Sequence, residues 1–152
     1  MSATTQHTYT IKEAAALTGL PASTLRYYES IGVIAPISRG ASSRHRVYDE
    51  ADLDQVMWVA CLAATGMSVA DMRQYVANGQ LGPAAAGQQI ALLAEQESRL
   101  VLEAEQVVLR QQYVRLKIDY WNAVAAGDTA RADQISGEAR TLADQLKRAS
   151  HP

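Results

Sequence analysis

Residues 9–36 read YTIKEAAALTGLPASTLRYYESIGVIAP, and their pattern predicts the architecture of the first half of the chain. Thr10 and Glu13 have the spacing of a capping box, in which each side chain bonds a free backbone N–H, so a helix is predicted to begin there. Gly19 allows a tight turn. A second helix is expected from about Ala22 to Ser30. Two short helices joined in this way form a helix-turn-helix, whose second helix enters the major groove of DNA.

The second predicted helix carries side chains that suit a DNA groove. Arginine and tyrosine reach phosphate oxygens, and arginine, serine and threonine also bond to base edges. Several such side chains are crowded into this short segment. The predicted contacts are therefore Ser23, Thr24, Arg26, Tyr27 and Tyr28.

Residues 37–48, ISRGASSRHRVY, follow the two helices and are too rich in Gly and Ser to form another one. The segment is also too basic for a simple spacer, and we expect a short hairpin, or wing, that grips the sugar-phosphate backbone beside the groove. The alternative is a solvated basic loop, but its position next to the helix-turn-helix favours a wing. The predicted wing contacts are Arg39, Arg44, His45, Arg46 and Tyr48.

The charge is distributed unevenly along the chain. The net formal charge is −2, yet residues 1–48 contain five Lys and Arg against two Glu, which gives +3. Residues 49–152 contain nine Lys and Arg against fourteen Asp and Glu, which gives −5. Positive charge is thus concentrated where a phosphate backbone would be met.

Composition indicates a soluble cytoplasmic protein that does not enter a membrane. No run approaches the roughly eighteen apolar residues of a membrane span, and the polar N-terminus lacks the apolar core of an export signal. A single cysteine cannot form an internal disulfide, which fits a reducing compartment.

Two further helices are predicted after the wing. Asp49 can cap a helix that extends to about Ala64, and Ser68 with Asp71 can open another. In the second of these, Arg73 is a candidate DNA contact, although a solvated arginine is an equal alternative. The first has apolar residues at helical spacing, which predicts one core-facing side made of Leu53, Val56, Met57, Ala60, Cys61 and Ala64.

Together, these motifs resemble the DNA-binding head of the MerR family of bacterial transcription regulators. The resemblance rests on the Tyr-Thr-Ile start, on LRYYE at 25–29, on RVYDEADL at 46–53 and on GMSVADMR at 66–73. It implies a winged helix-turn-helix head in a homodimer. It also implies that the protein binds an overlong promoter spacer and distorts it so that RNA polymerase can engage both promoter elements, which depends on deformable DNA steps.

Beyond residues 78–83, NGQLGP, the pattern changes to heptads. Apolar positions alternate in steps of three and four across 84–126, which predicts a coiled-coil helix about 60 Å long. Glu97 and Gln111 also fall on this seam and would restrict its register. The predicted dimer contacts are Ile90, Leu93, Leu100, Ala104, Val107, Val114, Ile118 and Trp121.

A helix of this length cannot bury its seam against a head of about eighty residues. Its simplest partner is the same helix of a second copy, antiparallel if the resemblance holds. The alternative is a helix packed within a larger complex.

The last segment is predicted to be a short helix that begins after Gly127, with Asp128 as its cap. Its apolar stripe could fold back over the coiled coil or the partner's head, where an inducer could act. The predicted organisation is therefore a mostly α protein with a DNA-binding head at 1–77, a linker at 78–83, a dimerisation helix at 84–126 and a C-terminal helix and tail at 127–152.

Cys61 has two interpretations. Cys61-Leu-Ala-Ala-Thr-Gly66 is similar to a segment in the branch of the MerR family that responds to aldehydes, electrophiles and nitrosative stress, which implies a thiol switch. Free cysteines are also among the most buried residue types, and this alternative is a core cysteine.

Other functional classes find less support in the sequence. The sequence contains no glycine-rich phosphate-binding loop, no catalytic nucleophile paired with a general base, and no cofactor motif. We therefore expect no enzyme and no cofactor. His7, His45 and His151 lack the spacing of metal ligands. A DNA-architectural or excisionase-like protein remains an alternative, although the long seam argues against it.

Overall fold

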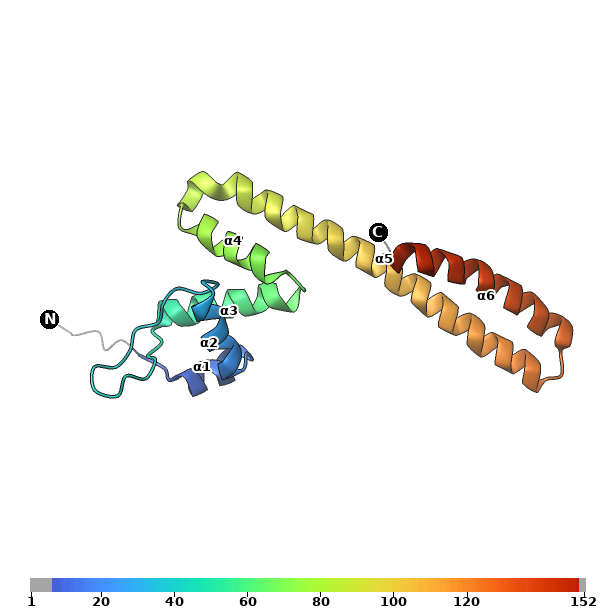
Figure 1. Cartoon of the computed structure of the whole chain (residues 1–152), viewed down its shortest axis with the longest axis horizontal. Coiled ribbons are helices and arrows are strands. Elements are labelled where there is room, and N and C mark those ends of the chain that lie inside the picture. Colours follow the sequence, from blue (N-terminus) through green and yellow to red (C-terminus); the bar gives the residue numbers. More distant parts are fainter. Residues whose placement is uncertain (1–6, 151–152) are drawn as a thin grey trace. The chain divides into compact units, whose positions relative to one another are not determined.

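The computed structural model describes residues 7–150, without the side chain of Ser150. Residues 1–6 and 151–152, which include the ends of the predicted segments and His151, lie outside the described residues. The predicted mostly α fold is confirmed (Figure 1). The elements are α1 (Ile11–Thr18), α2 (Ala22–Ser30), α3 (Glu50–Ala64), α4 (Val69–Gly79), the short 3₁₀ helix η1 (Gly82–Ala85), α5 (Ala86–Ala125) and α6 (Thr129–Ser150).

The chain divides into two units, residues 1–93 and 94–152, and each is described by itself. In the first, the predicted capping box at the start of α1 is present. The hydroxyl of Thr10 accepts a bond from the Glu13 N–H at 3.1 Å, and the Glu13 carboxylate accepts one from the Thr10 N–H at 3.1 Å. The Thr10 N–H that donates to the carboxylate lowers the pKa of Glu13. Gly19 ends α1 with a φ of 78°, in the left-handed region that glycine tolerates best.

The start of α3 is capped in the same way. The Asp49 carboxylate accepts a bond from the Asp52 N–H at 2.8 Å, and the Asp52 carboxylate accepts one from the Asp49 N–H at 3.0 Å. The start of α4 has a simpler cap, in which the Ser68 hydroxyl accepts a bond from the Asp71 N–H at 3.1 Å. These predicted helix starts are therefore set by local bonds.

The core-facing side of α3 differs from its prediction. Val56 and Val59 are buried, whereas Met57, Cys61 and Ala64 are exposed. The helix carries two apolar stripes, and periodicity could not tell which one faces the core. The interpretation of Cys61 as a core cysteine is thus wrong for the single chain.

One contiguous core holds the first unit together. It joins α1, α2, α3 and α4 with the segment that follows α2. Its largest fully buried side chains include those of Tyr48, Leu25, Ile34 and Met72. Because α2 and the segment after it share this core, the outer side of α2 is held in a fixed orientation.

In the second unit, α6 folds back along the latter half of α5 (Figure 1). Gly127 reverses the chain with a φ of 72°, and Asp128 caps α6 by accepting a bond from the Arg131 N–H at 3.0 Å. A small core joins the two helices and consists of Ala123, Ala132 and Ile135, with Leu116 and Tyr120 packed against it.

The predicted linker at 78–83 is largely helical, since α4 continues through Gly79 and η1 begins at Gly82. Asn78 is buried here, and its amide donates to the Gln89 side chain at 3.1 Å. Across residues 7–150, no helix combines the length and the apolar character needed to cross a membrane.

The exposure of Cys61 predicts that its thiol is reactive in the folded protein. A chromogenic disulfide reagent should titrate one thiol per chain without denaturant, and Cys61→Ser should give no signal. Reaction only after unfolding would contradict the exposed position. A rate that falls as protein concentration rises would indicate that a second copy covers the thiol.

Candidate nucleic-acid interface

One side of α2 is open to solvent. Ser23, Arg26 and Tyr27 are exposed there at the i, i+3 and i+4 positions that share one helical face. Leu25 is fully buried on the opposite side. Thr24 is half-buried at the edge of the open face. The open side of α2 therefore presents arginine, tyrosine and hydroxyl groups together.

The predicted wing is a hairpin formed by residues 38–47. An isolated antiparallel bridge pairs Arg39 with Arg46, and the Val47 N–H donates to the Ser38 carbonyl at 2.8 Å. At the tip, the Arg39 guanidinium donates to the Arg44 carbonyl at 3.1 Å. Arg39, Arg44 and His45 are all exposed, so the wing presents positive charge outward.

A second bridge ties the base of the wing to the segment before α1. Tyr9 and Tyr48 exchange two backbone hydrogen bonds, of 2.8 and 2.9 Å. The Tyr9 hydroxyl also donates to the Glu50 carboxylate at 2.9 Å, and this bond raises the pKa of Tyr9. The first turn of α1 is consequently held close to the wing.

A pocket of about 350 Å³ forms where α1, α2 and the wing meet. We call it the cationic pocket, because most of its lining side chains are basic. Its wall comprises Thr10, Ile11 and Lys12 from the start of α1, Arg26 from α2, and Arg39, His45 and Arg46 from the wing. The positive end of the α1 dipole adds to the charge of these side chains.

The cationic pocket is suited to an anion, since no carboxylate lines it. Phosphate oxygens of a nucleic-acid backbone match the charge of these residues, whereas the surface that faces the cavity is mostly apolar. Thr10 and Lys12 were not among the predicted members of this site. Lys12 was visible as part of the positive charge of residues 1–48, but only the fold brings it next to the wing.

Arg46 has a carboxylate partner outside the pocket lining. Its Nε donates to the Glu29 Oε1 at 2.7 Å, and the two side chains are only 19% and 15% exposed. Glu29 lies in the last turn of α2. This ion pair thus joins the wing to α2.

Two predicted contacts lie in the core instead of on the surface. Tyr48 is fully buried, so the prediction that it contacts the DNA flank is wrong. It is among the largest fully buried side chains of this core, and burial raises the pKa of its hydroxyl. Tyr28 is 8% exposed and belongs to the same core, which leaves only an edge of its ring for DNA. Two adjacent tyrosines, Tyr27 and Tyr28, do not by themselves show which of the two faces the core.

Arg73 is exposed on α4 but does not line the cationic pocket. Its role as a DNA contact stays a prediction. In the described part of the chain, no group of three His, Cys, Asp or Glu side chains is arranged to hold a metal ion.

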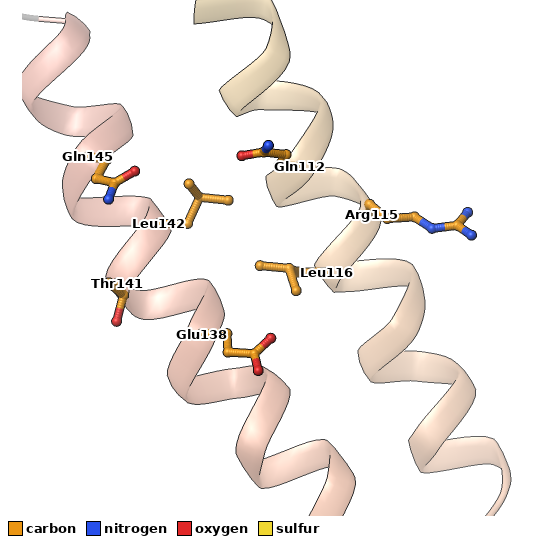
Figure 2. A pocket seen from close by; sticks show the side chains of 7 residues that line it. All are labelled: Gln112, Arg115, Leu116, Glu138, Thr141, Leu142 and Gln145. Carbon is orange, nitrogen blue, oxygen red and sulfur yellow. The ribbon is translucent and has the colours of Figure 1, made fainter.

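The second unit contains a groove between α5 and α6 that differs from the cationic pocket in its lining. Figure 2 shows Leu116 of α5 and Leu142 of α6 pointing toward each other in a groove of about 510 Å³. Arg115 points away from the groove, and Glu138 lies at its side. With an apolar floor and no gathered cations, this groove does not suit a phosphate backbone.

Comparison with known proteins identifies a family for the first unit. A family model described as "MerR HTH family regulatory protein" matches residues 9–79, which include every residue of the cationic pocket. The uncharacterised HTH-type transcriptional regulator YyaN of Bacillus subtilis (strain 168) is 41% identical over 71 residues, which are 47% of this chain and 51% of that relative. The HTH-type transcriptional regulator AdhR of the same organism is 33% identical over 91 residues, or 60% of this chain and 64% of the relative. The chain thus spans between half and two thirds of the length of these relatives.

Solved structures extend the likeness of fold to most of the chain. A putative MerR family transcriptional regulator from Listeria monocytogenes has a TM-score of 0.67 and 26% identity, with 86% of this chain and 98% of that chain covered. HiNmlR, a MerR family regulator lacking the sensor domain and bound to promoter DNA, also has a TM-score of 0.67. It is 23% identical, over 85% of this chain and 96% of that chain, and supports the fold alone.

The position of Tyr48 leads to a test of its role. Its hydroxyl finds no hydrogen-bond partner among residues 7–150, so Tyr48→Phe should keep or raise the free energy of unfolding, by up to about 1 kcal/mol. DNA binding should be unchanged. Tyr9→Phe is the matched control, because it removes a hydroxyl that has a partner, and it should not raise the free energy of unfolding in urea denaturation. A clear loss of stability in Tyr48→Phe would contradict the unpaired hydroxyl.

Proposed function

Because the chain belongs to the MerR family of helix-turn-helix regulatory proteins, we propose that it is a homodimeric transcription regulator that binds promoter DNA. The observation that carries this proposal is the cationic pocket, where α1, α2 and the wing converge. Basic residues from α1, α2 and the wing line this one pocket, and no carboxylate is among the lining residues. Such an arrangement favours a phosphate of a continuous backbone over an isolated acidic side chain.

In the proposed complex, the open side of α2 lies in the major groove. Ser23, Thr24, Arg26 and Tyr27 face base edges and flanking phosphates there. The cationic pocket receives a backbone phosphate at the edge of the groove. The exposed wing cations Arg39 and Arg44, together with the neighbouring His45, follow the backbone beside it and set the register of the head on the duplex without reading sequence.

The family relationship supports a proposal for how transcription is controlled. The protein would bind a pseudo-palindromic promoter spacer and bend and untwist it, and RNA polymerase would then engage both promoter elements. Sequence-dependent deformability of the spacer would contribute to specificity at positions the protein does not touch. A cytoplasmic location belongs to this proposal, because promoter DNA is found there in bacteria.

The outer face of α5 supports the homodimer. Its predicted seam is exposed along the whole helix, and its large apolar side chains are between 37% and 67% exposed. Single exposed apolar residues are ordinary, but a continuous heptad seam favours a partner helix. An antiparallel second copy would cover Ile90, Leu93, Leu100, Ala104, Val107, Val114, Ile118 and Trp121.

A thiol-based stress sensor is a second candidate for the same protein. The observation that favours it is the exposure of Cys61 on the outer side of α3, where a small-molecule or electrophile effector could reach the sulfur. A DNA-architectural or excisionase-like role would use the same head but leave the seam of α5 without a function.

Selection from a random pool of DNA duplexes tests the proposed function. The purified full-length protein should enrich a roughly palindromic sequence, and a nuclease footprint on it should show protected flanks with a hypersensitive, distorted centre. Failure to enrich any sequence at low salt would favour a protein-binding adaptor instead.

The role of Arg26 can be measured on the enriched duplex. Arg26→Ala should weaken binding and reduce the slope of log affinity against log salt by about 0.9, because one phosphate contact is lost. Arg148→Ala, which removes the same charge from the last turn of α6, is the control and should change neither quantity. An unchanged slope in Arg26→Ala would remove this residue from the interface.

The seam predicts a specific effect on oligomeric state. Val107→Glu would bury an unpaired carboxylate in both copies of the interface, which costs several kcal/mol, and should convert the dimer to monomer in sedimentation experiments. Glutamate is a good helix former, so α5 itself should persist. Ser98→Glu places the same charge on an exposed position away from the seam and should leave the dimer intact. A dimeric Val107→Glu variant would place the interface elsewhere.

A further inference from the structure

The ion pair between Glu29 and Arg46 connects two elements of the DNA-binding head. The arginine Nε donates to the carboxylate at 2.7 Å, and both side chains are largely shielded from solvent. A charged hydrogen bond in such a setting is stronger and less screened by salt than an exposed pair. The pair of Arg99 and Glu95 on α5, at 3.9 Å and with side chains 42% and 70% exposed, illustrates the weaker kind.

The bonds of the wing have separate tasks. Backbone bonds such as Val47 to Ser38, and the side-chain bond from Arg39 to the Arg44 carbonyl, shape the hairpin itself. The exchange between Tyr9 and Tyr48 fixes its base. Neither set of hydrogen bonds reaches α2, which the residues flanking the hairpin, Ile37 and Tyr48, meet through the shared core. The bond between Glu29 and Arg46 does reach α2, because one partner lies in the last turn of α2 and the other in the returning arm of the wing.

We propose that Glu29 is a positioning residue for DNA binding, which holds Arg46 and so fixes the wing relative to α2. This inference rests on the proposed function. With the ion pair in place, the wing cations Arg39 and Arg44 meet the backbone while α2 occupies the groove. Without it, the wing is held only at its base, through the core and the Tyr9–Tyr48 bridge, so its outer part must be ordered against the DNA backbone during binding.

The sign of the effect separates positioning from simple electrostatics. Glu29 carries a negative charge next to a surface that would meet phosphates. If charge alone mattered, Glu29→Gln should bind DNA as tightly as the wild type or more tightly. A positioning role requires the opposite result, because the neutral amide holds the guanidinium less strongly.

The experiment measures affinity for the enriched duplex over a range of salt concentrations. Glu29→Gln should bind roughly tenfold more weakly, with a salt slope lower by about 1.8, as expected if two wing phosphate contacts are lost. A hydroxyl-radical footprint should lose protection at the flanks and keep it where α2 lies. Asp54→Asn is the matched control, because it removes the same charge from an exposed position on α3 and should not weaken binding.

Arg46→Lys provides a second variant that keeps the positive charge but lacks the Nε donor. Positioning predicts weaker binding with the same flank loss, whereas a pure charge role predicts an unchanged slope. Glu29→Gln and Arg46→Lys combined should bind no more weakly than the worse single variant, since both break one interaction. Thermal unfolding of each variant identifies any that does not fold. If Glu29→Gln does not fold, Glu29→Asp, which keeps the charge but shortens the side chain that reaches Arg46, should give the same loss of flank protection.

Two outcomes would overturn the inference in distinguishable ways. Tight binding by both Glu29→Gln and Arg46→Lys, with intact flank protection, would overturn the positioning role and leave the regulator function standing. Failure of the wild type to enrich any duplex would overturn the proposed function and this inference with it.

Discussion

The antiparallel bridge between Tyr9 and Tyr48 is the constraint on which the DNA-binding head depends. Tyr9 directly precedes Thr10, the cap of α1, and Tyr48 directly precedes Asp49, the cap of α3. Two backbone hydrogen bonds therefore fix the starts of both helices and the base of the wing at one point. The buried ring of Tyr48 anchors this point in the core, so its structural role depends on its being hidden from DNA.

This constraint also explains why the positive charge converges. Lys12 and Arg26 lie on different helices, and Arg39 and Arg46 lie on opposite arms of the wing, yet all line one pocket. Bringing like charges together opposes folding. The apolar core offsets that repulsion, and the Glu29 carboxylate neutralises the charge of Arg46 through its ion pair. A bound phosphate would relieve the remaining repulsion, which favours the complex over the free head.

Features that depend on nearby residues could be predicted from the sequence, and features that depend on distant contacts could not. The capping boxes at Thr10 and Asp49 and the turn at Gly127 follow from residues a few positions apart, and the helices begin and end close to where they were expected. The burial of Tyr48 and the exposure of Cys61 depend on which side of an element meets the core. Lys12 lies in the site only because the long-range bridge between Tyr9 and Tyr48 brings the start of α1 next to the wing.

The two sides of α5 show how one pattern can hide another. Leu116, Tyr120 and Ala123 pack toward α6, whereas Val114 and Ile118 remain exposed on the seam. An amphipathic helix normally has one apolar side, and α5 has two in its latter half. Because α6 is covalently tethered, it satisfies the first side within the chain at little cost in association entropy. The seam is left as the face that needs a separate molecule, so folding of the hairpin and recruitment of a second copy can proceed through different surfaces of one helix.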